Sequence, residues 1–143
     1  MNNIRQISVF VENKQGMLGE VLHVLGDQGV NILSISLADT SEYGLIRLIV
    51  DRPEAGRNAL IEAGFSSMLA DVLVIKVPHV SGGLRKVLEL LVDKNVNVEY
   101  TYCLTAAGNE ASIVVKTNEL DAAIGVLGSA GIEVISSDAL TSK

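Results

Sequence analysis

The stretch GMLGEVLHVLGDQGVNI at residues 16–32 decides the fold, because it returns as GGLRKVLELLVDKNVNV at residues 82–98. Eight of the seventeen aligned positions are identical, where chance would give about one or two. A second match pairs AGFSSMLAD at residues 63–71 with AGIEVISSD at residues 130–138. The chain is therefore predicted to be a duplication, with one unit at residues 1–71 and another at 72–143. No stretch rich in Pro, Gly or Ser separates the two units.

Each repeat changes its hydrophobic period in the same order. Apolar residues alternate with polar ones over residues 7–11, as in a half-buried strand, and recur at helical spacing over residues 18–25. Gly29 and Asn95 follow the two first helices, and both tolerate the left-handed conformation common at a helix end. Two more strands, a helix and a last short strand follow in each unit. The predicted fold class is α+β, with two ferredoxin-like β-α-β-β-α-β units packed together.

The second helix of the first unit carries signals of its own start. Asp51 and Glu54 have the spacing of a capping box, in which side chains satisfy the first amides of a helix. Pro53 suits the first helical turn, where its missing N–H costs nothing. The sequence therefore predicts a helix that begins beside Pro53.

Composition excludes several classes of protein. The 143 residues are 48% hydrophobic with a mean hydropathy of +0.38, which excludes a disordered chain. No apolar run reaches the roughly 18 residues of a membrane span. A net charge of −6 argues against a nucleic-acid partner. The N-terminus meets Glu12 before any cleavage-like site, so no signal peptide is expected. A single cysteine fits a reducing compartment, and a cytoplasmic location is predicted.

The sequence shows no catalytic constellation. His23 and His79 fall in different units, and neither has the spacing of a metal ligand. Cys103 lies in a predicted strand without an adjacent base, which favours a buried structural thiol. No glycine-rich phosphate loop is present. We therefore expect a protein that is not an enzyme and that holds no metal or cofactor.

Polar residues stand at matched places around the first strand-to-helix loop. Asn13 ends the strand, and residues 15–18 open a helix whose free amides attract a carboxylate. Asn31 opens the next strand, so its side chain is expected to converge with Asn13 on one edge of the unit. An asparagine amide supplies the donor and the acceptor that an α-amino acid requires. The alternative is that Asn31 and its counterpart Asn97 only satisfy the backbone of a turn.

The loop motifs resemble those of the ACT domain, a β-α-β-β-α-β regulatory module. The first copy reads N-K-Q-G-M-L from Asn13 and G-V-N-I from Gly29. The second reads H-V-S-G-G-L from His79 and N-V-N-V from Asn95. The resemblance covers both halves and implies a protein that binds an amino acid and tunes a biosynthetic or degradative enzyme.

The resemblance also implies which residues bind. In the serine-binding ACT domain of phosphoglycerate dehydrogenase, the ligand is held by one asparagine in the loop and another after the helix. Asn13 and Asn31 match these two positions, whereas Val11 stands at that family's histidine and His79 replaces the loop Asp/Asn of the second unit. The first unit is therefore the better candidate. The predicted ligand-binding residues are Asn13, Lys14, Gln15, Gly16, Met17, Leu18, Asn31 and Ile32, with the second-unit equivalents His79, Ser81, Gly82, Gly83, Leu84 and Asn97.

Three functions stay open on the sequence. The preferred one is a stand-alone sensor that binds a free L-amino acid at the strand-to-helix loop, where units meet, and acts on an amino-acid-metabolism enzyme or on its own oligomer. The second is a structural or interaction subunit without a ligand, and the third is an enzyme on a ferredoxin-like scaffold.

Apolar residues in the second strand of each unit bear on assembly. Leu33, Ile35 and Leu37 in the first unit have the opposite parity to Tyr100 and Tyr102 in the second. An apolar sheet face without helices would require burial by the other unit or by another chain, which predicts a homodimer. The alternative is loose patterning without consequence.

Overall fold

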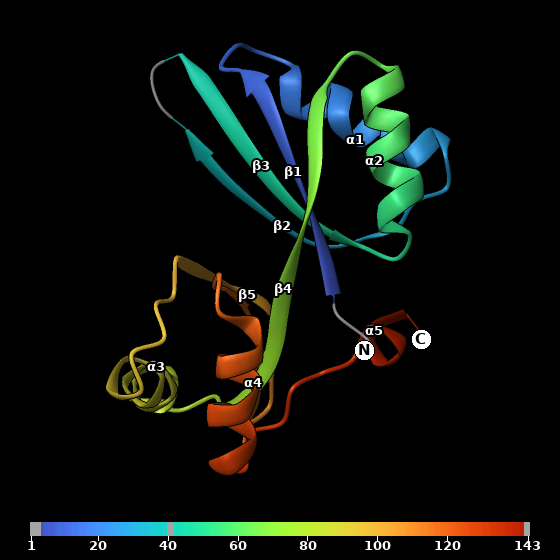
Figure 1. The fold of residues 1–143 in the computed structure, drawn as a ribbon. Helices are drawn as coiled ribbons and strands as arrows, with labels where there is room; N and C mark the ends of the chain where they lie inside the picture. The colour runs from blue at the N-terminus through green and yellow to red at the C-terminus, as the bar shows by residue number, and fades with distance from the viewer. Residues whose placement is uncertain (1–3, 40–41, 142–143) are drawn as a thin grey trace. The chain divides into compact units, whose positions relative to one another are not determined.

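A computed structural model describes residues 4–39 and 42–141 (Figure 1). Their contacts divide the chain into an N-terminal unit, Arg5–Ala70, and a C-terminal unit that holds Ile4 and the chain from Asp71 onward. The elements follow in the order β1 (Ile4–Glu12), α1 (Met17–Asp27), β2 (Ile32–Asp39), β3 (Tyr43–Val50), α2 (Pro53–Glu62), β4 (Ser66–Pro78), α3 (Gly83–Asp93), β5 (Tyr100–Ala107), β6 (Glu110–Lys116), α4 (Leu120–Ser129) and α5 (Ser137–Thr141).

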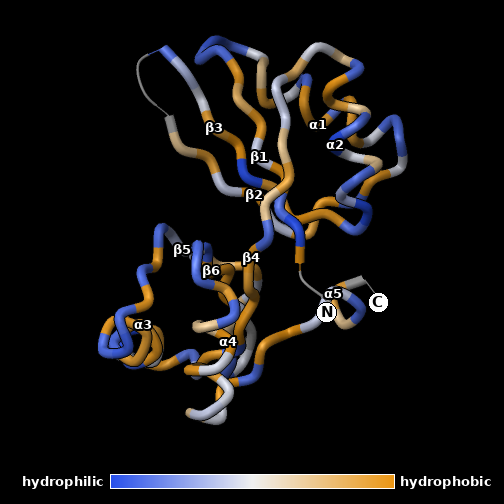
Figure 2. The backbone as a smooth tube through the Cα atoms, in the orientation of Figure 1, coloured by the Kyte–Doolittle hydropathy of each residue, from blue (hydrophilic) through white to orange (hydrophobic). Residues whose placement is uncertain are grey.

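The N-terminal unit confirms the predicted β-α-β-β-α-β order. Its strands lie in the order β2-β3-β1-β4, and β3 pairs antiparallel with both of its neighbours. Helices α1 and α2 pack against the same side of the sheet (Figure 1). Figure 2 shows hydrophobic segments in the strands and along parts of the helices. The buried core consists of Ile7, Val9, Val21, Leu25, Val30, Ile46, Leu48, Val50 and Leu60.

Strand β4 spans the predicted boundary between the units. Its 13 residues run without a break from Ser66 to Pro78, and Figure 1 shows them as one green strand. The strand closes the sheet of the N-terminal unit and pairs antiparallel with β6 in the C-terminal unit. The chain therefore passes from one unit to the next without a linker.

The C-terminal unit repeats the pattern up to its last strand. Strands β4, β6 and β5 form its sheet, and α3 and α4 pack against the core around Leu91 and Leu127. The predicted last strand at residues 130–138 is reduced to a single bridge between Ile75 and Val134. Two residues further on, Ser136 Oγ accepts a hydrogen bond from the Ala139 amide at the start of α5 (Ser137–Thr141).

The predicted helix ends are confirmed by the backbone. Gly29 has a φ of 68° and Asn95 a φ of 61°, both in the left-handed region. Beyond each helix, the amides of Val30 and Val96 donate to the carbonyls of Leu25 and Leu91. These bonds satisfy carbonyl groups that the helix itself leaves without donors.

The predicted capping box is wrong, although α2 does begin at Pro53. Arg52 stands at the N-cap and makes no side-chain cap bond. Asp51 Oδ1 instead accepts a hydrogen bond of 2.9 Å from the Asn31 amide. The carboxylate is engaged by the start of β2 rather than by its own helix. Glu119 repeats this contact in the second unit, where it accepts a bond of 3.1 Å from the Asn97 amide.

A bulge decides which face of the sheet the apolar residues of β2 occupy. The register shifts between Ile32 and Ser34, and a shift of one residue moves the following side chains to the other face. Ile35 pairs with Leu48 and Leu37 with Ile46, so both lie on the helix-covered face. In the second unit, Tyr100 and Tyr102 lie on the face without helices and stack at 6.4 Å between ring centroids. The face without helices carries apolar residues in both units, because Phe10, which is 49% exposed, pairs with Leu45 on that face of the N-terminal sheet.

Replacing Arg52 by alanine is expected to lower the free energy of unfolding by about 1 kcal/mol. Arg52 Nη2 donates to the carbonyls of Gln28 at 2.7 Å and Gly29 at 2.6 Å, at the negative end of α1. Solvent reaches these bonds and replaces part of their contribution. Chemical denaturation measures the change, with Arg57→Ala as control, because Arg57 donates to its neighbour Asn58 within α2 rather than to the end of α1. An equal loss in both variants would contradict the assignment.

Candidate functional site

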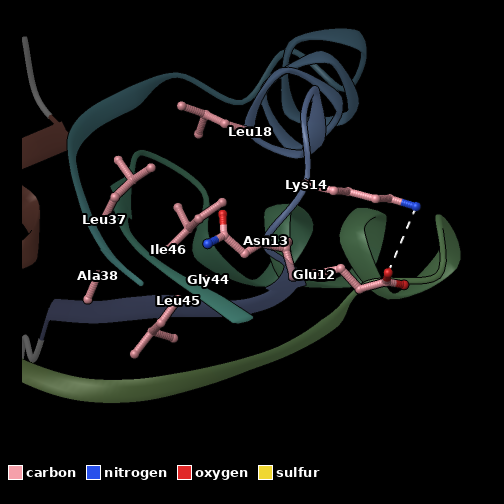
Figure 3. A pocket seen from close by; sticks show the side chains of 10 residues that line it. Glu12, Asn13, Lys14, Leu18, Leu37, Ala38, Gly44, Leu45 and Ile46 are labelled. Atoms are coloured by element: carbon pink, nitrogen blue, oxygen red, sulfur yellow. Dashed lines mark ion pairs between the residues drawn. The ribbon is translucent and has the colours of Figure 1, made fainter. Parts of the chain in front are cut away.

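A cavity of about 350 Å³ lies within the N-terminal unit, where β1 ends and α1 begins (Figure 3). The end of β2 and the start of β3 close its other side. Its lining residues are Val11, Glu12, Asn13, Lys14, Leu18, Leu37, Ala38, Gly44, Leu45 and Ile46. The cavity is therefore assembled from three strands, a loop and a helix of one unit.

The walls of the cavity are aliphatic. Val11, Leu37 and Ile46 share the helix-covered face of the sheet, because Val11 pairs with Gly44 and Leu37 with Ile46. Leu18 extends toward them from the first turn of α1 (Figure 3). Leu37 is 56% exposed, so its side chain forms an accessible part of the wall rather than of the core.

Gly44 leaves space at the floor of the cavity. It pairs with Val11 on the face that carries the apolar walls. A Cβ added at this residue would stand 3.1 Å from Val11 Cγ2, which is tighter than ordinary van der Waals contact. Any larger side chain at position 44 would therefore occupy volume that the cavity now offers.

Polar groups stand at the mouth of the cavity. The backbone of the loop is fixed by the Asn13 amide, which donates to the Glu42 carbonyl at 3.0 Å, and by the Lys14 amide, which donates to the Glu12 carbonyl at 2.9 Å. Figure 3 shows the side-chain carboxamide of Asn13 turned toward Ile46, while the side chains of Glu12 and Lys14 extend away from it. Lys14 Nζ lies 3.9 Å from Glu12 Oε2, with both side chains mostly exposed. The two charges offset one another, and such a surface pair contributes little to stability.

The predicted first-unit residues separate into those at the cavity and those away from it. Asn13, Lys14 and Leu18 line it, whereas Gln15, Gly16 and Met17 do not. Gly16 has a φ of 90° and turns the loop into α1. The first-turn amides of Leu18 and Gly19 have no acceptor within the helix, as in every α-helix. Gly44 and Ile46 were missed, because the register of β3 against β1 is not visible in the sequence.

The predicted convergence of Asn13 and Asn31 within one unit is wrong. Asn13 follows Glu12, which pairs with Tyr43 at the start of β3. Asn31 precedes Ile32, which pairs with Val50 at the end of β3. The seven residue steps between these positions span roughly 23 Å along a strand. Asn31 and Ile32 therefore do not reach the cavity of their own unit. They would contact a ligand in a cavity of this kind only if it belonged to another unit or another chain.

The second unit reproduces the loop backbone but not the side chain at the start of its helix. The His79 amide donates to the Asn109 carbonyl at 2.9 Å, as Asn13 does to Glu42. Gly82 has a φ of 81°, like Gly16. Gly83, which matches Met17, is buried, and a Cβ built there would overlap the Pro78 carbonyl oxygen. Of the other predicted equivalents, Ser81 and Asn97 are exposed, and Leu84 packs against the second core.

Other reactive side chains stand apart from this cavity. Cys103 is exposed on β5, so the prediction of a buried thiol is wrong. It fails because β5 stands at the end of the strand order, where no further strand covers it. His23 is 77% exposed and lies 3.2 Å from Asp27. Within residues 4–39 and 42–141, no three His, Cys, Asp or Glu side chains gather as metal ligands. In the same residues, no helix is both long and apolar enough to cross a membrane.

The duplicated unit and its loop agree with a family model that describes an ACT domain pair, which matches residues 2–142. The chain belongs to the ACT domain family. ACT domain pairs are regulatory modules rather than catalytic ones. Among curated protein sequences, none matches the chain.

Solved structures share this ACT domain pair architecture. Protein BT0572 from Bacteroides thetaiotaomicron is 32% identical, with a TM-score of 0.92, and the match covers 99% of this chain and 98% of that one. The regulatory subunit of aspartate kinase from Thermus thermophilus is 16% identical, with a TM-score of 0.67 over 90% of this chain and 93% of that one. The corresponding subunit from Thermus flavus is 15% identical, with a TM-score of 0.64 over 92% and 94%. The two Thermus proteins show a shared fold.

Proposed function

We propose that this ACT domain pair binds a free L-amino acid in the cavity beside Asn13 and passes the binding event to a partner enzyme or to its own oligomer. The observation that carries the proposal is the cavity at the repeated strand-to-helix loop, with an asparagine amide turned toward its apolar walls. The regulatory role of ACT domain pairs supports it. The similar fold of aspartate kinase regulatory subunits points to an enzyme of amino-acid metabolism as the kind of partner.

The loop has the groups that a zwitterion requires. An α-amino acid presents a carboxylate, which needs donors, and an ammonium, which needs acceptors. The Asn13 side chain offers one of each, and the backbone amide of Leu18, in the first turn of α1, adds a donor at the positive end of that helix. The site therefore does not require a buried charge, whose desolvation is costly. A useful switch needs about 1–3 kcal/mol of coupling between ligand and partner.

Asn13→Ala is expected to weaken binding of the amino acid about ten- to hundredfold, because Asn13, exposed in the free protein, would be covered by the ligand, and a buried hydrogen-bonding partner is worth about 1–3 kcal/mol. A thermal-shift screen of the twenty amino acids identifies the ligand, and calorimetry then compares the variant with the parent protein. His79→Ala, at the same loop position of the second unit, is the matched control and should change affinity less.

Two other outcomes would redirect the proposal. If no amino acid stabilises the protein, the remaining reading is an interaction subunit without a ligand. Asn31 lies far from the cavity of its own unit. If Asn31→Ala weakens binding as much as Asn13→Ala does, Asn31 must contact a ligand that is bound in the cavity of another copy. That result would support a homodimer in which the site is shared, and sedimentation would measure the mass of the assembly.

A further inference from the structure

We infer that the cavity selects amino acids with a branched aliphatic side chain, namely leucine, isoleucine or valine. This inference rests on the proposed function, because it concerns the side chain of the ligand that Asn13 would hold. It is carried by the chemistry of the walls and by the size of the cavity.

The walls present methyl groups from four elements. Val11 belongs to β1, Leu18 to α1, Leu37 to β2 and Ile46 to β3. A ligand side chain between them would leave water for an apolar surround, and each buried methylene strengthens binding about fourfold. Valine adds two carbons to alanine and leucine adds three. We therefore expect leucine, isoleucine or valine to bind at least about tenfold more tightly than alanine.

The charged residues at the mouth of the cavity pair with each other and do not favour a charged ligand side chain. Glu12 and Lys14 are the charged residues of the lining, and they pair with each other at 3.9 Å. Both side chains extend away from the Asn13 amide group (Figure 3). An aspartate or lysine side chain among the aliphatic walls would lose its hydration without gaining a fixed counter-charge. A serine hydroxyl would likewise meet methyl groups rather than hydrogen-bonding partners.

The volume agrees with a ligand of this size. About 350 Å³ is at the small end of the roughly 300–1,000 Å³ found for ligand pockets. Such a cavity suits a single amino acid and leaves little room for a nucleotide or a larger cofactor. The exposed Leu37 gives the cavity an accessible wall that can be changed without disturbing the core.

Calorimetry with leucine, isoleucine, valine, alanine, serine, aspartate and lysine tests the selectivity on the whole protein. Leu37→Ser should weaken leucine binding about tenfold, because it removes an apolar wall, and should change alanine binding much less. Ile35→Ser is the matched control. Ile35 lies two residues away on the same face of β2 and is 38% exposed, but it does not line the cavity.

The outcomes separate this inference from the proposed function. Tightest binding of a branched aliphatic amino acid, sensitive to Leu37→Ser but not to Ile35→Ser, would support both. Tighter binding of serine, aspartate or lysine, with sensitivity to Asn13→Ala, would overturn the selectivity and leave the sensor intact. If none of the seven amino acids binds, the selectivity is overturned with the proposed site. If Leu37→Ser and Ile35→Ser weaken leucine binding equally, the walls do not contact the ligand and the inference fails.

Discussion

Replacing Gly44 by valine is expected to weaken amino-acid binding at least about a hundredfold, which corresponds to about 2.7 kcal/mol. Gly44 lies in β3 opposite Val11, on the face that carries the apolar walls of the cavity. The three carbons of a valine side chain would fill the space in which we place the ligand. Position 44 has no positive φ, so a β-branched residue is compatible with its strand conformation.

A graded series separates a blocked cavity from a damaged fold. Gly44→Ala adds a single methyl group, 3.1 Å from Val11 Cγ2, and should weaken binding less than Gly44→Val does. The free energy of unfolding, measured by urea denaturation, should change by no more than about 1 kcal/mol in either variant. The small change reflects two opposing effects, the close approach to Val11 and the better strand propensity of Val or Ala over Gly. Undiminished affinity in Gly44→Val would place the ligand elsewhere in the protein.

Replacing Gly83 by alanine is expected to lower the free energy of unfolding by about 3 kcal/mol. Gly83 is the first residue of α3, and a Cβ there would overlap the carbonyl oxygen of Pro78 at the end of β4. The obstacle is backbone, so no side-chain rotation can relieve it. The helix start would have to move away from the strand end, and Val87 and Leu91 would lose part of their packing in the second core.

Gly125→Ala is the matched control for this effect. Gly125 lies in α4 of the same unit, and a Cβ added there meets nothing within 4 Å. The substitution should therefore stabilise the protein by about 0.5–1 kcal/mol through helix propensity. Urea denaturation measures both variants. Equal stability of Gly83→Ala and the parent protein would contradict the tight approach of α3 to Pro78.

Comparison of the matching positions in the two units shows why the destabilising effect of Gly83→Ala could not be predicted from the sequence. Met17 and Gly83 occupy the same place in the repeat and begin α1 and α3. A methionine is half-buried at the first position, whereas only a hydrogen fits at the second. The alignment shows the difference in residue but not the distance to Pro78. That distance depends on how closely a helix approaches the end of a strand.

Some residues of the candidate site could be identified from the sequence, and others only from the tertiary structure. The loop residues Asn13, Lys14 and Leu18 were identified from the sequence, because a strand end, a glycine turn and a helix start are local signals. Leu37 and Ile46 come from strands far along the chain, and their place at the cavity follows from strand pairing. The bulge near Ser34 decides that Leu37 faces the helices. No local sequence pattern predicts a bulge of this kind.

The sequence by itself determined the duplication, the order of elements within the repeats and the left-handed residues Gly29 and Asn95 at two helix ends. These features depend on hydrophobic period and on the conformational freedom of single residues, which act over a few positions. The tertiary structure alone decided that Asn31 stands away from Asn13 and that Gly44 opens a cavity. Both depend on strand register, which is fixed by pairing between residues distant in the chain and by the side chains packed on the sheet.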